Sequence, residues 1–423
     1  MTVKAQRIAP VGTILNEDTI RAVLHEGIGN TLDGARVLVL IPDHTRTLPL
    51  PLLFRLTVEA LADARSLAFM VALGTHPALS EESLLRLVGI TAEERATTYR
   101  HVELLNHDWE NPGALATIGT ISRDEVQAVA GDAWHESLGG DVAIRLNRRA
   151  LEVDHLLILG PVFPHEVVGF SGGAKYLFPG ISSADMINVT HWLGALITIL
   201  DTIGIAETPV RALIHRAADR VPTPIILAAL VVDSKTGGLA GLFVGDHLTA
   251  WRAAAALSAE RHIVWVDRPF TRALSIAPPM YDELWTAAKA MYKIEPALAD
   301  GGEVIVYAPH LDTVSIVHGA HIYEGGYHVR DFYLKQWATY GRLPLGVLAH
   351  GTHLRGSGTY EQGVERARIQ VTLATKISPA DCERLSLGYA DPASFDLAAW
   401  QGREAEGVLF VPKAGETLYR VRV

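Results

Sequence analysis

The chain has 423 residues, of which 49% are hydrophobic and 20% are charged, and its formal net charge at pH 7 is −10. This composition predicts a globular protein of two domains, and the acidic balance disfavours a non-specific nucleic-acid partner. The sequence has no apolar leader and no run of 18 apolar residues, so we expect no membrane partner and a cytoplasmic location. The single cysteine, Cys382, excludes an intramolecular disulfide and a thiolate metal cluster.

Six apolar runs have the length of a buried strand, at 36–42, 67–74, 154–162, 224–233, 273–279 and 302–309. Segments with helical spacing alternate with them, at 51–64, 80–89, 247–262 and 281–298. Ser80 is a typical N-cap for the helix at 80–89. Such alternation predicts right-handed βαβ units, so we expect an α/β fold with mainly parallel sheets and flanking helices. A new βαβ series begins near 265–272, which predicts domains at 1–268 and 269–423.

Polar side chains follow the predicted strands at the points where the strands end. These residues are Asp43, His44, Thr45 and Arg46 after 36–42, Thr75 and His76 after 67–74, and His165 and Lys175 after 154–162. Because the carboxyl ends of parallel strands meet at one edge of a sheet, we expect these side chains to converge on one crevice. A single histidine after a strand is more often a structural hydrogen-bond partner, but three such turns together indicate a site.

The stretch "GPVFPHEVVGFSGGAKYLFPGISS" (160–183) carries a Gly-rich turn that ends at Lys175. It differs from a phosphate-binding P-loop, which needs Gly before the lysine and Ser or Thr after it, where this chain has Ala174 and Tyr176. NTP hydrolysis is therefore disfavoured. Gly172 and Gly173 still permit a phosphate or a flat cofactor to approach the backbone closely, and a lysine amine can form a covalent link.

A set of motifs resembles the nickel-dependent lactate racemase family. The motifs are "DHTR" (43–46), "GTHP" (74–77), "PHE…GFSGGAK…PGIS" (164–182) and "NVTHW" (188–192), followed by "APPMYDELWTAAKAM" (277–291), "GGEVIVYAP" (301–309) and "LATKIS" (373–378). The resemblance covers nearly the whole chain. It implies an isomerase that racemises or epimerises 2-hydroxy acids, with its active site in the cleft between two α/β domains.

The resemblance also implies a nickel-pincer nucleotide, a Ni-containing pyridinium-3-thioamide-5-thiocarboxylic acid mononucleotide. The first domain would then bind the cofactor and carry catalysis, and the last ~35 residues of the second could pack back on it. Lys175 resembles the lysine that tethers this cofactor, and His191 resembles the nickel ligand. Asp43, Thr45, Gly172 and Gly173 are expected on the cofactor side.

His76 and His165 resemble the paired acid/base histidines of the family, one on each face of the substrate. Inversion by proton removal would place two negative charges side by side, whereas reversible hydride transfer leaves a 2-keto acid. A racemase working this way needs a proton acceptor for each enantiomer. Arg46 and Lys289 resemble the cations that hold the substrate carboxylate.

The chain departs from the family pattern near the substrate. Thr47 and Leu48 precede Pro49, where the family usually has Pro directly after Arg46, and Trp285 and Thr286 replace a usual Tyr-Gln pair. These two residues are expected beside the substrate carboxylate. The segment "HGTHLRGSG" (350–358) carries His350, His353 and Arg355, which would meet a distal carboxylate or form a solvated loop. We therefore expect malate or a larger acid in preference to lactate.

Two other functions fit parts of the sequence. A zinc hydrolase would use His76, His165 and His191 as metal ligands. A non-catalytic sensor of 2-hydroxy acids could use the same fold, although it would not need a symmetric pair of histidines. The expected partners are a small 2-hydroxy acid and the cofactor-synthesis enzymes, and a homo-oligomer is left open.

Overall fold

The structure is a computed structural model that describes residues 2–422. Its first half is built on a seven-stranded sheet with the order β1-β11-β10-β7-β2-β3-β4. These strands are β1 (Val3–Ile8), β2 (Arg36–Ile41), β3 (Ser66–Val71), β4 (Val102–Asn106), β7 (His155–Pro161), β10 (Ile225–Val232) and β11 (Leu239–Asp246). All neighbours from β10 to β4 pair in parallel, whereas β1 and β11 form an antiparallel edge. The predicted α/β class is confirmed.

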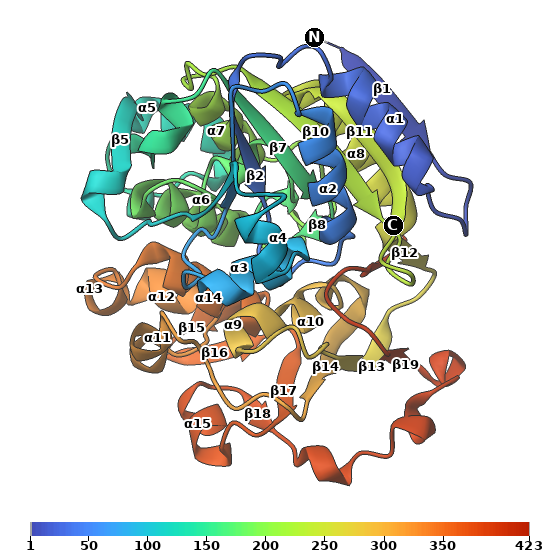
Figure 1. The fold of residues 1–423 in the computed structure, drawn as a ribbon. Helices are drawn as coiled ribbons and strands as arrows, with labels where there is room; N and C mark the ends of the chain where they lie inside the picture. The colour runs from blue at the N-terminus through green and yellow to red at the C-terminus, as the bar shows by residue number, and fades with distance from the viewer. Residues whose placement is uncertain (1, 423) are drawn as a thin grey trace.

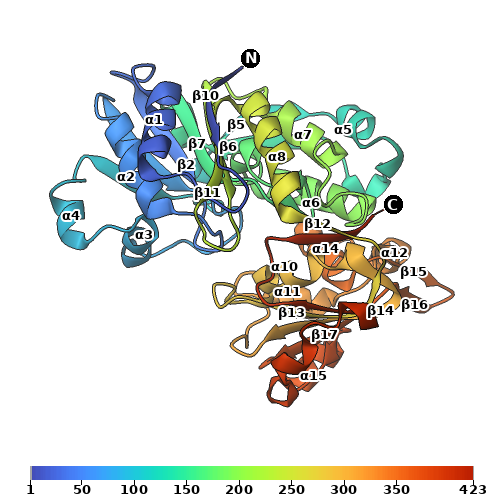
Figure 2. The same cartoon turned by 90° about the vertical axis from the view of Figure 1, so that its right-hand side faces the viewer.

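Helices cover both faces of this sheet, as Figure 2 shows. One face packs against α1 (Glu17–Ile28), α2 (Leu50–Ala60) and α3 (Glu81–Val88), and the short helix α4 (Ala92–Ala96) follows α3. The other face packs against α6 (Ala184–Ile197), α7 (Pro209–Ala218) and α8 (His247–His262). As predicted, Ser80 caps α3, because its side chain accepts a hydrogen bond from the backbone N–H of Ser83. Beyond α6 lie α5 (Arg123–Ala130) and the antiparallel pair β5 (Leu115–Ile121) and β6 (Val142–Asn147).

The second half contains a five-stranded sheet, drawn in yellow, orange and red tones in the lower part of Figure 1, with the order β18-β17-β14-β13-β19. Its strands, all parallel, are β13 (Phe270–Ile276), β14 (Leu298–Ala308), β17 (Gln370–Thr375), β18 (Gly388–Tyr389) and β19 (Val408–Val411). Its helices are α9 (Leu284–Ala287), α10 (Lys289–Tyr292), α11 (Gly319–Gly325), α12 (Arg330–Lys335), α13 (Trp337–Tyr340), α14 (Leu345–Arg355) and α15 (Pro379–Arg384). A small hairpin, β15 (Gly358–Glu361) and β16 (Val364–Ala367), follows α14.

The end of the chain returns toward the first half. Strand β20 (Leu418–Val421) pairs in parallel with β12 (Ile263–Val266), which lies between the two large sheets in sequence. Lys413 donates a hydrogen bond to the carbonyl of Ser234, and Arg420 donates to the carbonyls of Leu200 and Ile203. The domain boundary at 268/269 stays a prediction. No helix within residues 2–422 has the length and apolarity needed to cross a membrane.

Two of the predicted segments differ from the structure. The helix expected at 281–298 is broken into α9, α10 and a 3₁₀ turn at Glu295–Ala297, where Pro296 cannot continue the backbone hydrogen bonding. The segment 350–358 is not a solvated loop, because residues up to Arg355 belong to α14. Within this helix His350 and His353 are 7% and 2% exposed.

Candidate active site

The structure brings most of the predicted site residues to the carboxyl edge of the first sheet. A cavity of about 370 Å³, the central cavity, lies there. Among its lining residues are Asp43, Arg46, His76, Lys175, His191 and Trp285. Residues on both sides of position 268 contribute to its wall, since Val317, His318 and Val347 also line it. A smaller hollow beside it is lined by Gly172, Lys175 and Tyr176, together with Asp43 and Arg46.

A third hollow, the cationic pocket, adjoins the same region. It is lined by Arg46, Lys289 and Lys293 together with His165 and Glu166. Arg46 lines all three spaces, so its guanidinium connects the central cavity with the cationic pocket. Burial, followed by the charge of Arg46, holds the pKa of Lys289 well below its ordinary value. An anion bound in the cationic pocket would stabilise the charged form of Lys289 and raise its pKa again.

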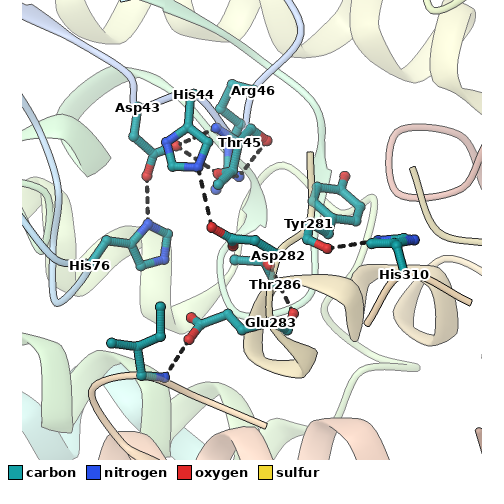
Figure 3. A network of polar contacts seen from close by, with 11 residues as sticks. Asp43, His44, Thr45, Arg46, His76, Tyr281, Asp282, Glu283, Thr286 and His310 are labelled. Atoms are coloured by element: carbon teal, nitrogen blue, oxygen red, sulfur yellow. Dashed lines mark hydrogen bonds and ion pairs between the residues drawn. The ribbon is translucent and has the colours of Figure 1, made fainter. Parts of the chain in front are cut away.

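His76 is held by a buried carboxylate, as Figure 3 shows. Its Nδ1 lies 2.5 Å from Oδ2 of Asp43, while Oδ1 of Asp43 accepts hydrogen bonds from the backbone N–H and the hydroxyl of Thr45. Burial alone would raise the pKa of Asp43, but His76, Arg46 and Thr45 outweigh it and hold the pKa well below its ordinary value. The ionised carboxylate accepts a hydrogen bond from Nδ1–H of His76, which leaves Nε2 as the ring nitrogen for exchange with a substrate.

His191 also leaves its Nε2 available, but here a backbone carbonyl, not a carboxylate, holds Nδ1. It lies on α6, where its Nδ1 donates to the backbone carbonyl of Ile187, 2.7 Å away and one turn earlier in the helix. This bond fixes the proton on Nδ1 and leaves the lone pair of Nε2 available for a metal. Burial, and next the charge of Lys175, lower the pKa of His191 to about 4, so the ring is neutral at pH 7.

Lys175 lies in a 3₁₀ turn, Gly173–Tyr176, that follows a tight hairpin of β8 (Pro164–His165) and β9 (Gly169–Phe170). The hairpin needs glycine at 169, because the backbone φ there is +79° and a Cβ atom would lie 1.7 Å from the carbonyl oxygen of Ile205. Burial is the main cause that lowers the pKa of Lys175 to about 8. Its amine is therefore a far better nucleophile at neutral pH than an ordinary lysine amine.

Arg211 is a buried residue of this region that the sequence analysis missed. It is 0% exposed, lies over the ring of Trp251, and donates hydrogen bonds to the backbone carbonyls of Phe170 and Gly172. These two hydrogen bonds fix the backbone of the Gly-rich segment at Phe170 and Gly172. The "RALIH" sequence around it reads as an ordinary amphipathic helix, so no local signal distinguishes this arginine from a surface one.

Four residues considered for the site from the sequence lie outside the lining of these cavities. Thr286 does not line the cavities described above; it is buried and its hydroxyl donates to the carbonyl of Glu283. Gly173 is required by packing, since a Cβ atom there would lie 2.9 Å from the ring of Trp251. His350 lies behind the cavity wall, stacked on Trp285 with ring centres 4.1 Å apart. Its neighbour Arg355 lies beside Glu365 at 3.7 Å, away from the cavity lining.

The zinc alternative is not supported. Within residues 2–422, no group of three or more His, Cys, Asp or Glu side chains is arranged to hold a metal ion. His165 lines the cationic pocket, whereas His76 and His191 line the central cavity. A hydrolytic zinc site needs three protein ligands around one point.

The fold and the cavity define an α/β protein whose ligand site lies at the carboxyl edge of a parallel sheet. Residues 9–198 match the family model described as the lactate racemase N-terminal domain. The chain is 25% identical over 313 residues to the lactate racemase of Thermoanaerobacterium thermosaccharolyticum, covering 70% of this chain and 66% of that protein. It is also 25% identical over 299 residues to the lactate racemase of Lactiplantibacillus plantarum, covering 69% of this chain and 62% of that protein.

Two solved structures share the fold of this chain. A Thermotoga maritima protein is 29% identical, with a TM-score of 0.88 and coverage of 97% of this chain and 99% of that one. The lactate racemase apoprotein of T. thermosaccharolyticum shares the fold, with a TM-score of 0.72 at 18% identity over 98% and 94% of the two chains. The sequence matches span about two thirds of the length of the curated relatives. The chain is thus similar to the lactate racemases, and its residues 9–198 match the model of their N-terminal domain.

Proposed function

We propose that the protein is an isomerase that inverts the C2 stereocentre of a 2-hydroxy acid. The observation that carries this proposal is the pairing of His76 with Asp43 in the cavity that also contains Lys175 and His191. An imidazole with a protonated, carboxylate-bound Nδ1 can remove the proton of a substrate hydroxyl at Nε2. The relationship to lactate racemases supports the same reaction class.

Different residues of the chain would bind the substrate, transfer its proton and exclude water. Arg46 offers a bidentate guanidinium to the substrate carboxylate, and Lys289 adds a point charge from the cationic pocket. His76 would take the hydroxyl proton of one enantiomer and His165 that of the other. The apolar walls from Trp285, Val317 and Val347 would exclude water from the reacting carbon.

We propose a nickel-pincer nucleotide as the resident cofactor, delivered by cofactor-synthesis enzymes. Two features of the site fit it: the buried Lys175 amine has its pKa lowered to about 8, and His191 has a free Nε2. Cys382, the single cysteine, is buried in the second half, so thiolate-type sulfur donors at the site would have to come from the cofactor. Lys175 would hold the group covalently and His191 would ligate its nickel. When bound, the cofactor would supply reversible acceptance of the C2 hydride.

We propose a substrate larger than lactate. The central cavity of about 370 Å³ would hold both the cofactor and the substrate, so this proposal rests on the polar residues of the cavity wall and not on its volume. The residues first expected to recognise a second carboxylate, His353 and Arg355, do not line it. A polar group such as the second carboxylate of malate would instead meet His318 or His321, which line the same wall.

The test is racemisation of a panel of acids by protein produced together with the cofactor-synthesis enzymes. Chiral chromatography of lactate, malate, phenyllactate and gluconate at equal concentrations should show the highest kcat/KM for an acid larger than lactate. Arg355→Ala should leave that preference unchanged, because Arg355 pairs with Glu365 away from the cavity. A clear preference for lactate would overturn the proposed larger substrate, and no turnover of any acid would overturn the proposed reaction.

A further inference from the structure

The two acid/base histidines hold their protons differently. An imidazole that exchanges protons with a substrate at Nε2 needs a proton on Nδ1 in both its neutral and its charged form. His76 meets this requirement, because the buried carboxylate of Asp43 lies 2.5 Å from Nδ1. A racemase needs the same competence on the opposite face of the substrate, where His165 is expected to act.

His165 is in the opposite tautomer. The backbone N–H of Val167 donates to its Nδ1 at 3.1 Å, so the proton of the neutral ring lies on Nε2. The ring is neutral because burial, followed by the charges of Lys175, Lys293 and Arg46, holds the pKa of His165 well below its ordinary value. In this form Nε2 is a donor, and it cannot accept the proton of a substrate hydroxyl.

A second carboxylate lies beside the same nitrogen. Oε2 of Glu166 is 3.5 Å from Nδ1 of His165, and both residues line the cationic pocket and are buried. The strongest charge that Glu166 faces is that of Lys293. Although burial would raise the pKa of Glu166, the charge of Lys293 and a backbone hydrogen bond hold it below the ordinary value, so the carboxylate is ionised.

From this geometry we propose that Glu166 is the positioning residue for His165, as Asp43 is for His76. In the working state its carboxylate replaces the Val167 N–H at Nδ1, so that the proton moves to Nδ1 and Nε2 becomes an acceptor. The exchange needs Glu166 to approach by less than about 1 Å to reach hydrogen-bonding distance. No proton is gained or lost in it, because the ring only changes tautomer. The proposal rests on the proposed function and completes its symmetry: each enantiomer meets a histidine backed by a carboxylate.

Nitrogen-15 NMR of the cofactor-free protein tests the pairing without any turnover. Long-range ¹H–¹⁵N spectra distinguish the two tautomers, and His165 is assigned by the signal lost in His165→Gln. We expect wild type to show a measurable fraction of the Nδ1–H form at His165, and Glu166→Gln to show the Nε2–H form alone. His76 is the internal reference and should be Nδ1–H in both proteins. An identical His165 tautomer in wild type and Glu166→Gln would overturn the proposal.

Kinetics of the cofactor-loaded enzyme provide the second arm. Glu166→Gln should lower kcat by about 10²–10⁴-fold with little change in KM, because the ring remains but its tautomer is wrong. Glu103→Gln, a surface carboxylate paired with Arg149, is the matched control and should be unaffected. If Glu166 only balanced the charge of Lys293, the double variant Glu166→Gln/Lys293→Met would recover activity, and that recovery would contradict the assignment. A wild type without turnover would remove the proposed function but leave the NMR result standing.

Discussion

Replacing His76 by Gln is expected to lower kcat/KM by about 10²–10⁴-fold in both directions of interconversion, the usual size of general acid–base catalysis. Glutamine fills a similar volume but cannot take the hydroxyl proton of the substrate. Because two enantiomers have equal free energy, the equilibrium constant is fixed and the two directions must fall together. Chiral chromatography started from each pure enantiomer measures both values.

Two further variants test whether the loss in His76→Gln is specific to this residue. Asp43→Asn should approach the loss seen in His76→Gln, because an amide no longer fixes the proton on Nδ1 of His76. His101→Gln replaces an exposed histidine of the same half and should have no effect. Near-normal turnover by His76→Gln would remove this residue from the chemistry, and the two-histidine account would fail with it.

Lys175→Ala is expected to abolish turnover and any covalent mass increment on the protein. With the pKa of Lys175 lowered to about 8, roughly a tenth of its amines are neutral and nucleophilic at pH 7, whereas an ordinary lysine has almost none. The side chain points into a cavity, so its loss should leave the fold intact. Intact-protein mass spectrometry of chains made beside the cofactor-synthesis enzymes measures the increment.

Two comparisons locate the tether. Lys235→Ala, at an exposed lysine of the same half, should keep the full increment. His191→Ala should keep the nucleotide mass but lose nickel, because only the metal ligand is removed. An unchanged increment in Lys175→Ala would place the covalent link on another residue.

The location of the site could be predicted from sequence because it follows from strand direction. Asp43 and His76 come directly after β2 and β3, which pair in parallel with Ile41 beside Val71. His165 follows β7, the other parallel neighbour of β2. Three turns after adjacent parallel strands must lie at one edge of the sheet, whatever the rest of the chain does.

Partners of individual side chains could not be predicted in the same way. The expectation of Asp43 on the cofactor side stays a prediction, and the structure adds its contact with His76, because a sequence does not reveal which way a turn directs its carboxylate. Lys293 and Glu166 look like surface charges in a sequence, and only the packing of the second half against the first buries them. The tautomers of His165 and His191 depend on backbone groups, which every residue type carries alike.

The segment 350–358 shows how a polar reading can mislead. Its His, Thr, Arg and Ser letters suit a solvated loop, yet every residue of α14 from Gly346 to Leu354 is buried, the polar ones included. A helix that is buried all round has no polar face, so the sequence carries no amphipathic period by which to recognise it. The antiparallel edge of β1 and β11 was missed because β1 is only partly buried and lacks a continuous apolar run.

Racemisation of a C2-deuterated 2-hydroxy acid in ordinary water tests the central claim most directly. Cofactor-loaded wild type is mixed with one enantiomer of the labelled acid, and chiral chromatography with mass detection follows both the configuration and the label. If the C2 hydrogen leaves with its electron pair and returns to the same carbon, the opposite enantiomer appears with its deuterium retained. Product that carries solvent hydrogen at C2 would contradict the hydride account, and the absence of the opposite enantiomer would contradict the assignment of the protein as a 2-hydroxy-acid racemase.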